Sequence, residues 1–342
     1  MAQTTVENLI VNTHFLRYFQ QAIIDRSRLL KSGIVQTDAE IQRRCNEAGF
    51  SGNFVKLPFF NALATTGSGH VEERLVEGVA LTPDGITAGE DVAVITRRGK
   101  AFGATDLSAS LSGEDPMVAI ANQLADYWNV RKEAKLFAIL KGVFADNVTN
   151  DSSDLVLDIS GETGAAAVLD KNTINLAAQL LGDRKMELTA IAMNSAAETV
   201  LAGLDTNAGL YRASEGPAIL SKYNGRDIFI DDNCAYNPST KVAEIFLFGK
   251  GAVANASVPT KVPFETGREA LKSQSFLVSR VSEIVHVRGI KWKVSDVNPD
   301  NDKTGTAGNP GYIAGLSDGG NWDRVYDQKD IRVVKLVCKL AA

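Results

Sequence analysis

One long stretch of helix-forming sequence, residues 115–144, constrains the fold of this chain more than any other feature. Asp115 can accept a backbone N–H of the first helical turn as an N-cap. Pro116 suits the first helical position because the N–H that it lacks is not needed there. No further proline follows, and the first glycine in the stretch is Gly142. The stretch therefore predicts a single helix roughly 45 Å long. A usual helix has only about 11–12 residues, so this one would be far longer.

The pattern within this stretch predicts a packed side and a solvent side. Apolar residues recur at helical steps, as on a helix face that packs against a core. They are Met117, Ile120, Leu124, Trp128 and Ala134, with Ala121, Tyr127, Phe137, Ala138 and Leu140 widening the stripe. Most of the other side is taken by Asp126, Arg131, Lys132, Glu133, Lys135 and Lys141. Such a helix alone is equally compatible with an α+β enzyme and with a structural protein.

Composition excludes several classes of protein. A chain of 342 residues is long enough for two domains or one elaborate domain, and 44% hydrophobic with 23% charged residues is ordinary for a soluble protein. A formal net charge of −5 argues against a protein that wraps nucleic acid with a basic face. No stretch approaches the roughly 20 apolar residues of a membrane span. The N-terminus carries Glu7 and lacks the basic region of a secretory signal, so we expect synthesis in the cytoplasm.

The N-terminal residues 4–31 predict one amphipathic helix or two short ones. The apolar stripe consists of Val6, Leu9, Ile10, Phe15, Phe19, Ile23 and Ile24, and the polar side of Arg17, Gln21, Asp25 and Arg26. A terminal segment is ordered only where it is tied down. We therefore expect this one either to dock on its own core or to reach a neighbour.

Residues 51–111 change to β character. A short strand is predicted at 53–60, and a turn-rich segment with Pro83, Asp84, Gly85 and Gly89 follows a polar, glycine-rich stretch. Residues 91–107 alternate well enough to predict a strand and its return. The two faces of that strand would carry Val92, Val94 and Thr96, and Ala93, Ile95 and Arg97. A hairpin of this kind cannot bury a core of its own, so we interpret it as an assembly arm.

After the long helix, residues 146–154 (DNVTNDSSD) predict a polar linker and a sub-domain boundary. Residues 168–204 predict helix, strand and helix, with Asp170 as a cap and Gly182 as a stop. Ser195 and Glu198 have the spacing of a capping box for the second of these helices. Further strands are predicted within 226–233, 242–249, 262–294 and 331–340.

Residues that could carry chemistry are few and dispersed. His14, His70 and His286 are too far apart in the sequence for a convincing metal or acid–base centre, and a structural role is expected for His286 in an apolar strand. Gly67-Ser68-Gly69 lacks the pattern of a nucleophile elbow. In FGKGAVAN, Lys250 precedes a glycine where a phosphate loop needs Ser or Thr. The three cysteines, Cys45, Cys234 and Cys338, have no metal-ligand spacing and are expected to be reduced thiols.

The acidic loop at 296–302 is the sharpest candidate for a ligand site. Asp296, Asn298 and Asp300 occupy the first, third and fifth positions of a calcium loop, and Asp302 adds a carboxylate. However, Asn301 stands where that loop needs glycine, and Ala307 stands at the position of its bidentate glutamate. A polar surface loop explains the same residues. We therefore predict no catalytic, cofactor-binding or metal site, and calcium at 296–302 stays an open alternative.

The order of these features resembles a known family. An N-terminal arm, a long hairpin, a long helix, a mixed α/β block and a returning strand form the layout of the tailed-phage major capsid protein with the Hong Kong 97-type fold. Four stretches resemble its Gp13-like branch: residues 55–60, 81–117, 125–145 and 321–336. The resemblance spans nearly the whole chain, and 81–145 is its most specific part.

The resemblance implies an α+β shell subunit with five regions. These are an N-terminal arm (1–50), an extended β-hairpin loop (51–110), a peripheral domain (111–165) with the spine helix 115–144, an axial domain (166–261), and returning peripheral strands with the C-terminal segment (262–342). Copies would self-assemble as pentamers and hexamers into an icosahedral head shell around phage DNA, without enzymatic activity or cofactors. Scaffolding, portal and decoration proteins are the implied partners, and the virion is the implied location.

Two alternatives and one departure accompany this interpretation. An encapsulin-type compartment shell shares the fold, and an enzyme with an unrecognised site belongs to a different class. No helical prosegment of the kind some relatives carry precedes the arm, so a separate scaffolding protein, or none, is expected. Some capsids of this fold join a loop lysine to an asparagine covalently. Lys56 and Lys100 lie in the predicted hairpin, but no motif match transfers that reaction to them.

Overall fold

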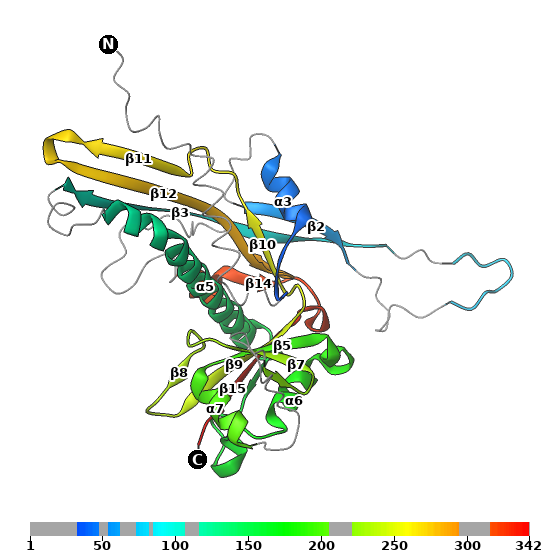
Figure 1. The fold of residues 1–342 in the computed structure, drawn as a ribbon. Helices are drawn as coiled ribbons and strands as arrows, with labels where there is room; N and C mark the ends of the chain where they lie inside the picture. Colours follow the sequence, from blue (N-terminus) through cyan, green and yellow to red (C-terminus); the bar gives the residue numbers. More distant parts are fainter. Residues whose placement is uncertain are drawn as a thin grey trace.

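The computed structural model describes residues 33–47, 54–61, 73–81, 85–106, 116–204, 221–293 and 315–341. In this part of the chain, one long helix runs between an elongated sheet and a more compact sheet with short helices around it (Figure 1). The predicted helix at 4–31, the Asp115 cap and the acidic loop at 296–302 lie outside the described residues.

The elongated sheet contains six strands within the described ranges, in the order β1-β10-β12-β3-β2 with β11 paired to β12. Their bounds are β1 (Val35–Thr37), β10 (Val253–Ser257), β12 (Gln274–Val287), β3 (Ala88–Thr105), β2 (Phe54–Phe60) and β11 (Phe264–Glu269). All pairs are antiparallel except β1 with β10. Segments far apart in the sequence therefore make up a single sheet.

The second sheet has seven described strands in the order β4-β15-β9-β5-β7-β6, with β8 paired to β9. Their bounds are β4 (Val156–Asp158), β15 (Val333–Lys339), β9 (Val242–Gly249), β5 (Leu188–Met193), β7 (Arg226–Ile230), β6 (Ser221–Tyr223) and β8 (Tyr236–Asn237). A small ladder pairs β13 (Ile290–Trp292) with β14 (Trp322–Arg324). The strands predicted within 226–233, 242–249, 262–294 and 331–340 are confirmed.

The described helices are α3 (Ala39–Asn46), α5 (Pro116–Asn150), α6 (Thr173–Ala178) and α7 (Ser195–Leu204). Short 3₁₀ turns are η2 (Gly164–Ala167), η3 (Gln179–Glu187), η4 (Ala270–Lys272), η5 (Gly319–Asn321) and η6 (Gln328–Asp330). In the described part of the chain, α5 included, no helix combines the length and hydropathy that crossing a membrane requires.

Helix α5 begins at Pro116 as predicted, but it ends at Asn150 and not at 144. The predicted linker at 146–154 is therefore wrong over its first half. Asn147 explains the extension, because its amide donates to Asp154 at 2.7 Å and accepts the N–H of Leu155 at 3.1 Å. The side chain of Asn150 likewise donates to Asp146 at 2.6 Å. These local hydrogen bonds support helix in a stretch whose composition is typical of a loop.

Helix α5 packs against two different cores along its length. Near its N-terminal end, Leu124, Ala125 and Trp128 form a cluster with Phe264 and Leu277 of the elongated sheet. Further along, the helix enters the main core through Leu136, Ile139, Leu140, Val143 and Phe144. Successive parts of the helix therefore bury different faces, while Arg131 and Glu133 stay partly exposed and Lys141 stays exposed.

Strand β3 corrects the predicted strand and return at 91–107. It is one strand of 18 residues. Its first part, 88–94, pairs with β2, and residues 95–105 pair with β12 on the other side. The alternation itself is confirmed, because Val94 faces the main core, while Ala93 and Ile95 face a separate cluster beside α3. The glycine at 99 does not turn the chain, since β12 supplies a ladder partner there.

The helix–strand–helix prediction at 168–204 is confirmed, but both predicted caps are wrong. The N-cap of α6 is Asn172, without a side-chain hydrogen bond, and not Asp170. At α7 the side chain of Asn194 accepts the N–H of Ala196 at 2.9 Å, and the Ser195 hydroxyl donates to Asp232 instead. Gly182 lies inside η3 at φ +60°, where it interrupts the helical path.

Trp128→Ala tests the helix packing on the elongated sheet. Its indole is buried and donates to Ser279 Oγ at 2.9 Å, so truncation removes a large apolar contact and a hydrogen bond. We expect a loss of about 3–5 kcal/mol in the free energy of unfolding, measured by urea denaturation. Val130→Ala on the same helix, where the side chain is 59% exposed, should change it by less than about 0.5 kcal/mol.

Gly142→Ala separates packing from helix propensity. Alanine is the better helix former by about 1 kcal/mol, but a Cβ at this position would clash with Leu316 O and Trp322 Nε1. Those two atoms are hydrogen-bonded at 2.9 Å. We expect destabilisation of about 1–3 kcal/mol in thermal unfolding. Gly203→Ala in α7, where no atom lies within 4 Å, should instead be stabilising.

Candidate functional site

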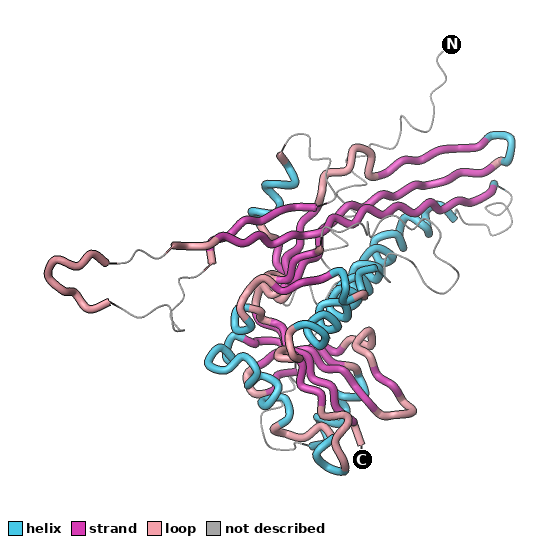
Figure 2. Tube along the Cα trace, turned by 180° about the vertical axis from the view of Figure 1, so that it is seen from behind, coloured by secondary structure: helices cyan, strands magenta, loops and turns pink. Residues whose placement is uncertain are grey.

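Exposed apolar side chains gather at the end of β2 and on the segment that joins β2 to β3. Phe60 is 75% exposed, Leu75 80% and Val79 67%. Val76, Leu81 and Ile86 are exposed as well. Figures 1 and 2 show residues 73–81 projecting far from both sheets. A cluster of exposed apolar side chains on a projecting segment marks a protein interaction surface.

The base of this projecting segment is stiffened by β pairing and side-chain contacts. The main chain of Asn61 donates to Thr87 O at 2.9 Å, and its amide donates to Thr87 Oγ1 at 2.8 Å. Below this pair, Phe59 packs edge-on against Tyr326 with ring centroids 4.8 Å apart. The ring of Phe59 also covers Gly89, where a Cβ would lie only 2.6 Å away. The arm therefore leaves the body of the protein from a well-packed base.

A buried His–Asp pair lies next to this base. His286 Nε2 and Asp91 Oδ2 are 2.9 Å apart, and the N–H of Gly289 donates to the same oxygen at 3.0 Å. Burial alone would raise the pKa of Asp91, but His286 and the backbone N–H groups of Gly289 and Val92 outweigh it and hold that pKa below the usual value. The structural role predicted for His286 is confirmed, because it joins β12 to β3.

A second buried charge pair attaches α5 to the elongated sheet, and it corrects the predicted solvent position of Lys135. This side chain is buried, with its ammonium 2.7 Å from Glu283 Oε1 and 2.7 Å from Thr96 Oγ1. The Thr96 hydroxyl donates in turn to the Glu283 backbone carbonyl at 3.0 Å. Lys132 lies 3.5 Å from the other carboxylate oxygen. Sequence reasoning missed this group, because a lysine on a helix gives no sign of a partner 148 residues away.

The electrostatics of this group follow from its burial. Burial would raise the pKa of Glu283, but Lys135 and Lys132 hold it below its usual value. Burial lowers the pKa of Lys135, against the pull of Glu283. Arg98 of β3 also acts on the Lys135 ammonium and disfavours its charged form. Glu283 thus lies among several cationic side chains. Removing either Glu283 or Lys135 would leave the other charge buried without its partner.

The remaining motifs form no chemical site in the described residues. Lys250 and Gly251 make the turn from β9 to β10, with Gly251 at φ +67° and no following helix, as expected from the failed phosphate-loop pattern. Cys45, Cys234 and Cys338 are free thiols, and all three are buried. Lys56 is in an ion pair with Glu90. No group of three metal-ligating side chains occurs in the described ranges. His14, His70, Gly67–Gly69 and the 296–302 loop lie outside them.

Comparison with known proteins identifies the family. Residues 44–331 match the family model of the Gp13-like, or major capsid protein 13-like, proteins. The chain belongs to this family. It is 35% identical to the major capsid protein of Bacillus phage SPP1, over 345 residues and 100% of both chains.

Solved capsid structures show the same fold at low sequence identity. The capsid of cyanophage Pam1 has a TM-score of 0.58 at 13% identity and covers 93% of both chains. The capsid of Ralstonia phage GP4 has a TM-score of 0.53 at 13% identity, covering 90% of this chain and 88% of that one. The Hong Kong 97-type α+β fold predicted from the sequence is confirmed. The chain is a structural major capsid protein of a tailed phage and not an enzyme.

Acidification tests the buried pair between helix and sheet. A carboxylate whose pKa is lower in the folded state stabilises the fold above its unfolded pKa of about 4.3, and this contribution is lost as pH falls through the folded value. The free energy of unfolding of the wild type should therefore decrease as the pH falls below about 4.3. Urea unfolding at a series of pH values measures this decrease. Glu283→Gln should lose roughly 3–5 kcal/mol at neutral pH and show a shallower acid slope. Glu90→Gln, at an exposed pair, should keep the wild-type slope. Equal slopes in all three proteins would contradict the assignment.

Proposed function

We propose that this capsid protein assembles as pentamers and hexamers into a closed icosahedral head shell that encloses the phage DNA. The observation that supports this most directly is the projecting, apolar segment between β2 and β3, which has a rigid base and no cover among the described residues. A repeated contact of one kind between identical subunits generates closed rings when its rotation closes. The net charge of −5 suits a container that must not bind its DNA tightly.

We propose that the chain divides into an N-terminal arm (1–50), an extended loop (51–110), a peripheral domain with its spine helix (111–165), an axial domain (166–261) and returning peripheral strands (262–342). The seven-stranded sheet supports an axial unit, because most of its strands come from 188–249. Four strands of the elongated sheet come from outside the proposed peripheral ranges, namely β1, β2, β3 and β10. Strand β1 pairs with β10, and β10 pairs with β12.

We propose that the exposed side chains of the extended loop are the anchors of the contact with a neighbouring subunit. Leu75, Phe60 and Val79 are the most exposed apolar residues of its described part. Burying a side chain of this size contributes about 1.5–3 kcal/mol, so a few such anchors per subunit add up over a closed shell. Synthesis in the host cytoplasm and contacts with portal, scaffolding or decoration proteins belong to the same proposal.

A cargo compartment of the encapsulin type is the alternative structural function. Membership in a phage capsid family and 35% identity to a phage protein favour the DNA container. Purified shells distinguish the two directly, since nuclease-protected DNA supports the phage head and a co-purified enzyme supports the compartment.

Removing the projecting segment tests the assembly role. Residues 62–86 are replaced by Asn-Gly, so that the Asn61–Thr87 pair closes a short hairpin on β2 and β3. We expect a folded subunit with a near wild-type unfolding midpoint that forms no shells in electron microscopy and sedimentation. The double variant Leu75→Ser with Val79→Ser should also assemble poorly, while Arg74→Gln in the same segment should assemble. Normal shells from the shortened chain would refute the role of the loop.

A further inference from the structure

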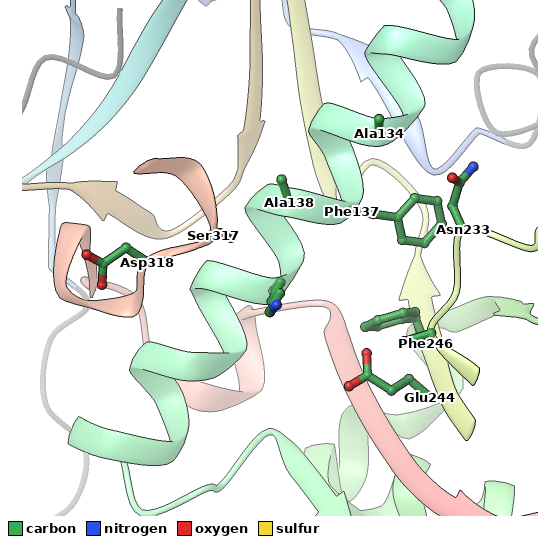
Figure 3. Close-up of a pocket in the computed structure, with 10 residues that line it drawn as sticks. Ala134, Phe137, Ala138, Asn233, Glu244, Phe246, Ser317 and Asp318 are labelled. Atoms are coloured by element: carbon green, nitrogen blue, oxygen red, sulfur yellow. The ribbon is translucent and has the colours of Figure 1, made fainter. Parts of the chain in front are cut away.

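A hollow of about 600 Å³ lies between helix α5 and the hairpin of β8 and β9. Its helix side is formed by Ala134, Phe137, Ala138 and Lys141, and its sheet side by Phe246 and Glu244. Figure 3 shows Phe137 and Phe246 reaching toward each other from the helix and the strand. Their ring centroids are 6.0 Å apart. Ala235, Asn233, Ser317 and Asp318 complete the lining, so the hollow presents apolar and polar side chains in about equal measure.

The helix side of this hollow has the spacing of a helix-docking face. Residues 134, 137, 138 and 141 lie at i, i+3, i+4 and i+7, which places them on one stripe. Two of the four are alanines, so another backbone can approach closely. Ala134 and Phe137 are only partly buried, although Phe137 packs against the main core. No described residue fills the hollow.

The chain itself provides a segment that fits. Residues 1–32 precede the first described residue, Gly33. Within them Phe15, Phe19 and Ile23 recur at four-residue steps, with Ala22 completing a stripe at i, i+4, i+7 and i+8. Arg17, Gln21 and Asp25 occupy the other side. An amphipathic helix that lays such a face into an apolar groove is a recurring mode of recognition.

The attachment point of this segment is close enough to the hollow. Gly33 O accepts the N–H of Gly251 at 2.9 Å. Gly251 follows Phe246 by five residues, and because the chain turns after Gly249 the two lie at most roughly 17 Å apart. Residues 25–32 span up to about 26–29 Å when extended, so they can bridge this distance. A short tether also gives the segment an effective concentration in the millimolar range, which favours its own subunit over a second copy.

We propose that residues 15–23 form an amphipathic helix that docks its Phe15–Phe19–Ile23 face in this hollow of the same subunit. The docked helix covers the partly exposed side chains of Ala134 and Phe137 and ties the N-terminus to the junction between α5 and the second sheet. This inference is independent of the proposed assembly function, because it concerns a contact within one subunit.

Disulfide trapping tests the contact. Phe19→Cys is combined with Ala134→Cys, since a disulfide forms only when the two Cα atoms come within about 4.4–6.8 Å. The control combines Phe19→Cys with Leu271→Cys at the tip of the β11–β12 hairpin, where the side chain is 99% exposed. The native thiols do not compete, because all three are buried, and burial raises the pKa of Cys338 to about 12 and also raises the pKa of Cys45.

We expect an intrachain bond in the Ala134 variant after mild oxidation of the unassembled full chain, and little in the control. The products are read on a non-reducing gel and by mass spectrometry of the linked peptides. Equal cross-linking of both variants would overturn the proposal, and so would a bond only between chains, because the helix would then dock on a second copy.

Filling the hollow gives an independent measurement. Ala134→Trp occupies the docking stripe, whereas Val130→Trp places the same side chain on the exposed face of the same helix. Trypsin cleavage at Arg17 should be about tenfold faster in Ala134→Trp, which corresponds to a loss of roughly 1.4 kcal/mol of docking free energy. Val130→Trp should cleave like the wild type. Equal cleavage of all three proteins would refute the docking, whatever the cross-linking shows.

Discussion

The structure depends on how one straight helix is held by two sheets at the same time. At the elongated sheet, Lys135 of α5 is bonded to Glu283 of β12 and to Thr96 of β3. This buried group fixes how the helix is rotated about its axis and how far along the sheet it lies. Apolar contacts alone allow small slips between helix and sheet, but a buried ammonium has few positions in which it is satisfied. Beyond this point the helix enters the main core through Leu140 and Phe144. The orientation of the second sheet therefore follows from the way the helix sits on the first.

The sequence predicts which helices and strands form better than it predicts where they end and what they pair with. The start of α5 at Pro116, the strands and the helix–strand–helix unit at 168–204 follow from local periodicity and turn chemistry, which act over a few residues. The end of α5 at Asn150 and the single strand β3 do not, because each depends on a partner brought by the tertiary fold. Asn147 extends the helix only because Leu155 turns back onto it, and β3 passes Gly99 without turning only because β12 lies beside it.

The candidate site shows the same division. The projecting arm could be predicted, because a β-ribbon with weak apolar patterning cannot support itself and must contact something else. Neither Asp91 nor Lys135 could be recognised as a buried tie from one sequence, since their partners His286 and Glu283 are distant in the chain and nothing in the local pattern marks them. The lack of a catalytic motif in the sequence agrees with a structural role. For a shell protein of this family, function lies in surfaces and in the stiffness between them.

Strand β3 also has a mechanical consequence. It is one continuous backbone that runs from the base of the projecting arm, through the centre of the sheet, to the far end beside β12. The hydrogen bonds of an antiparallel ladder lie perpendicular to the strands. A pull on the arm along β3 therefore loads the ladder at 95–105 in shear, so that its bonds resist together and are not opened one at a time. Tension between neighbouring subunits would thus be carried by the covalent backbone of β3, which the ladder with β12 holds at many positions along its length.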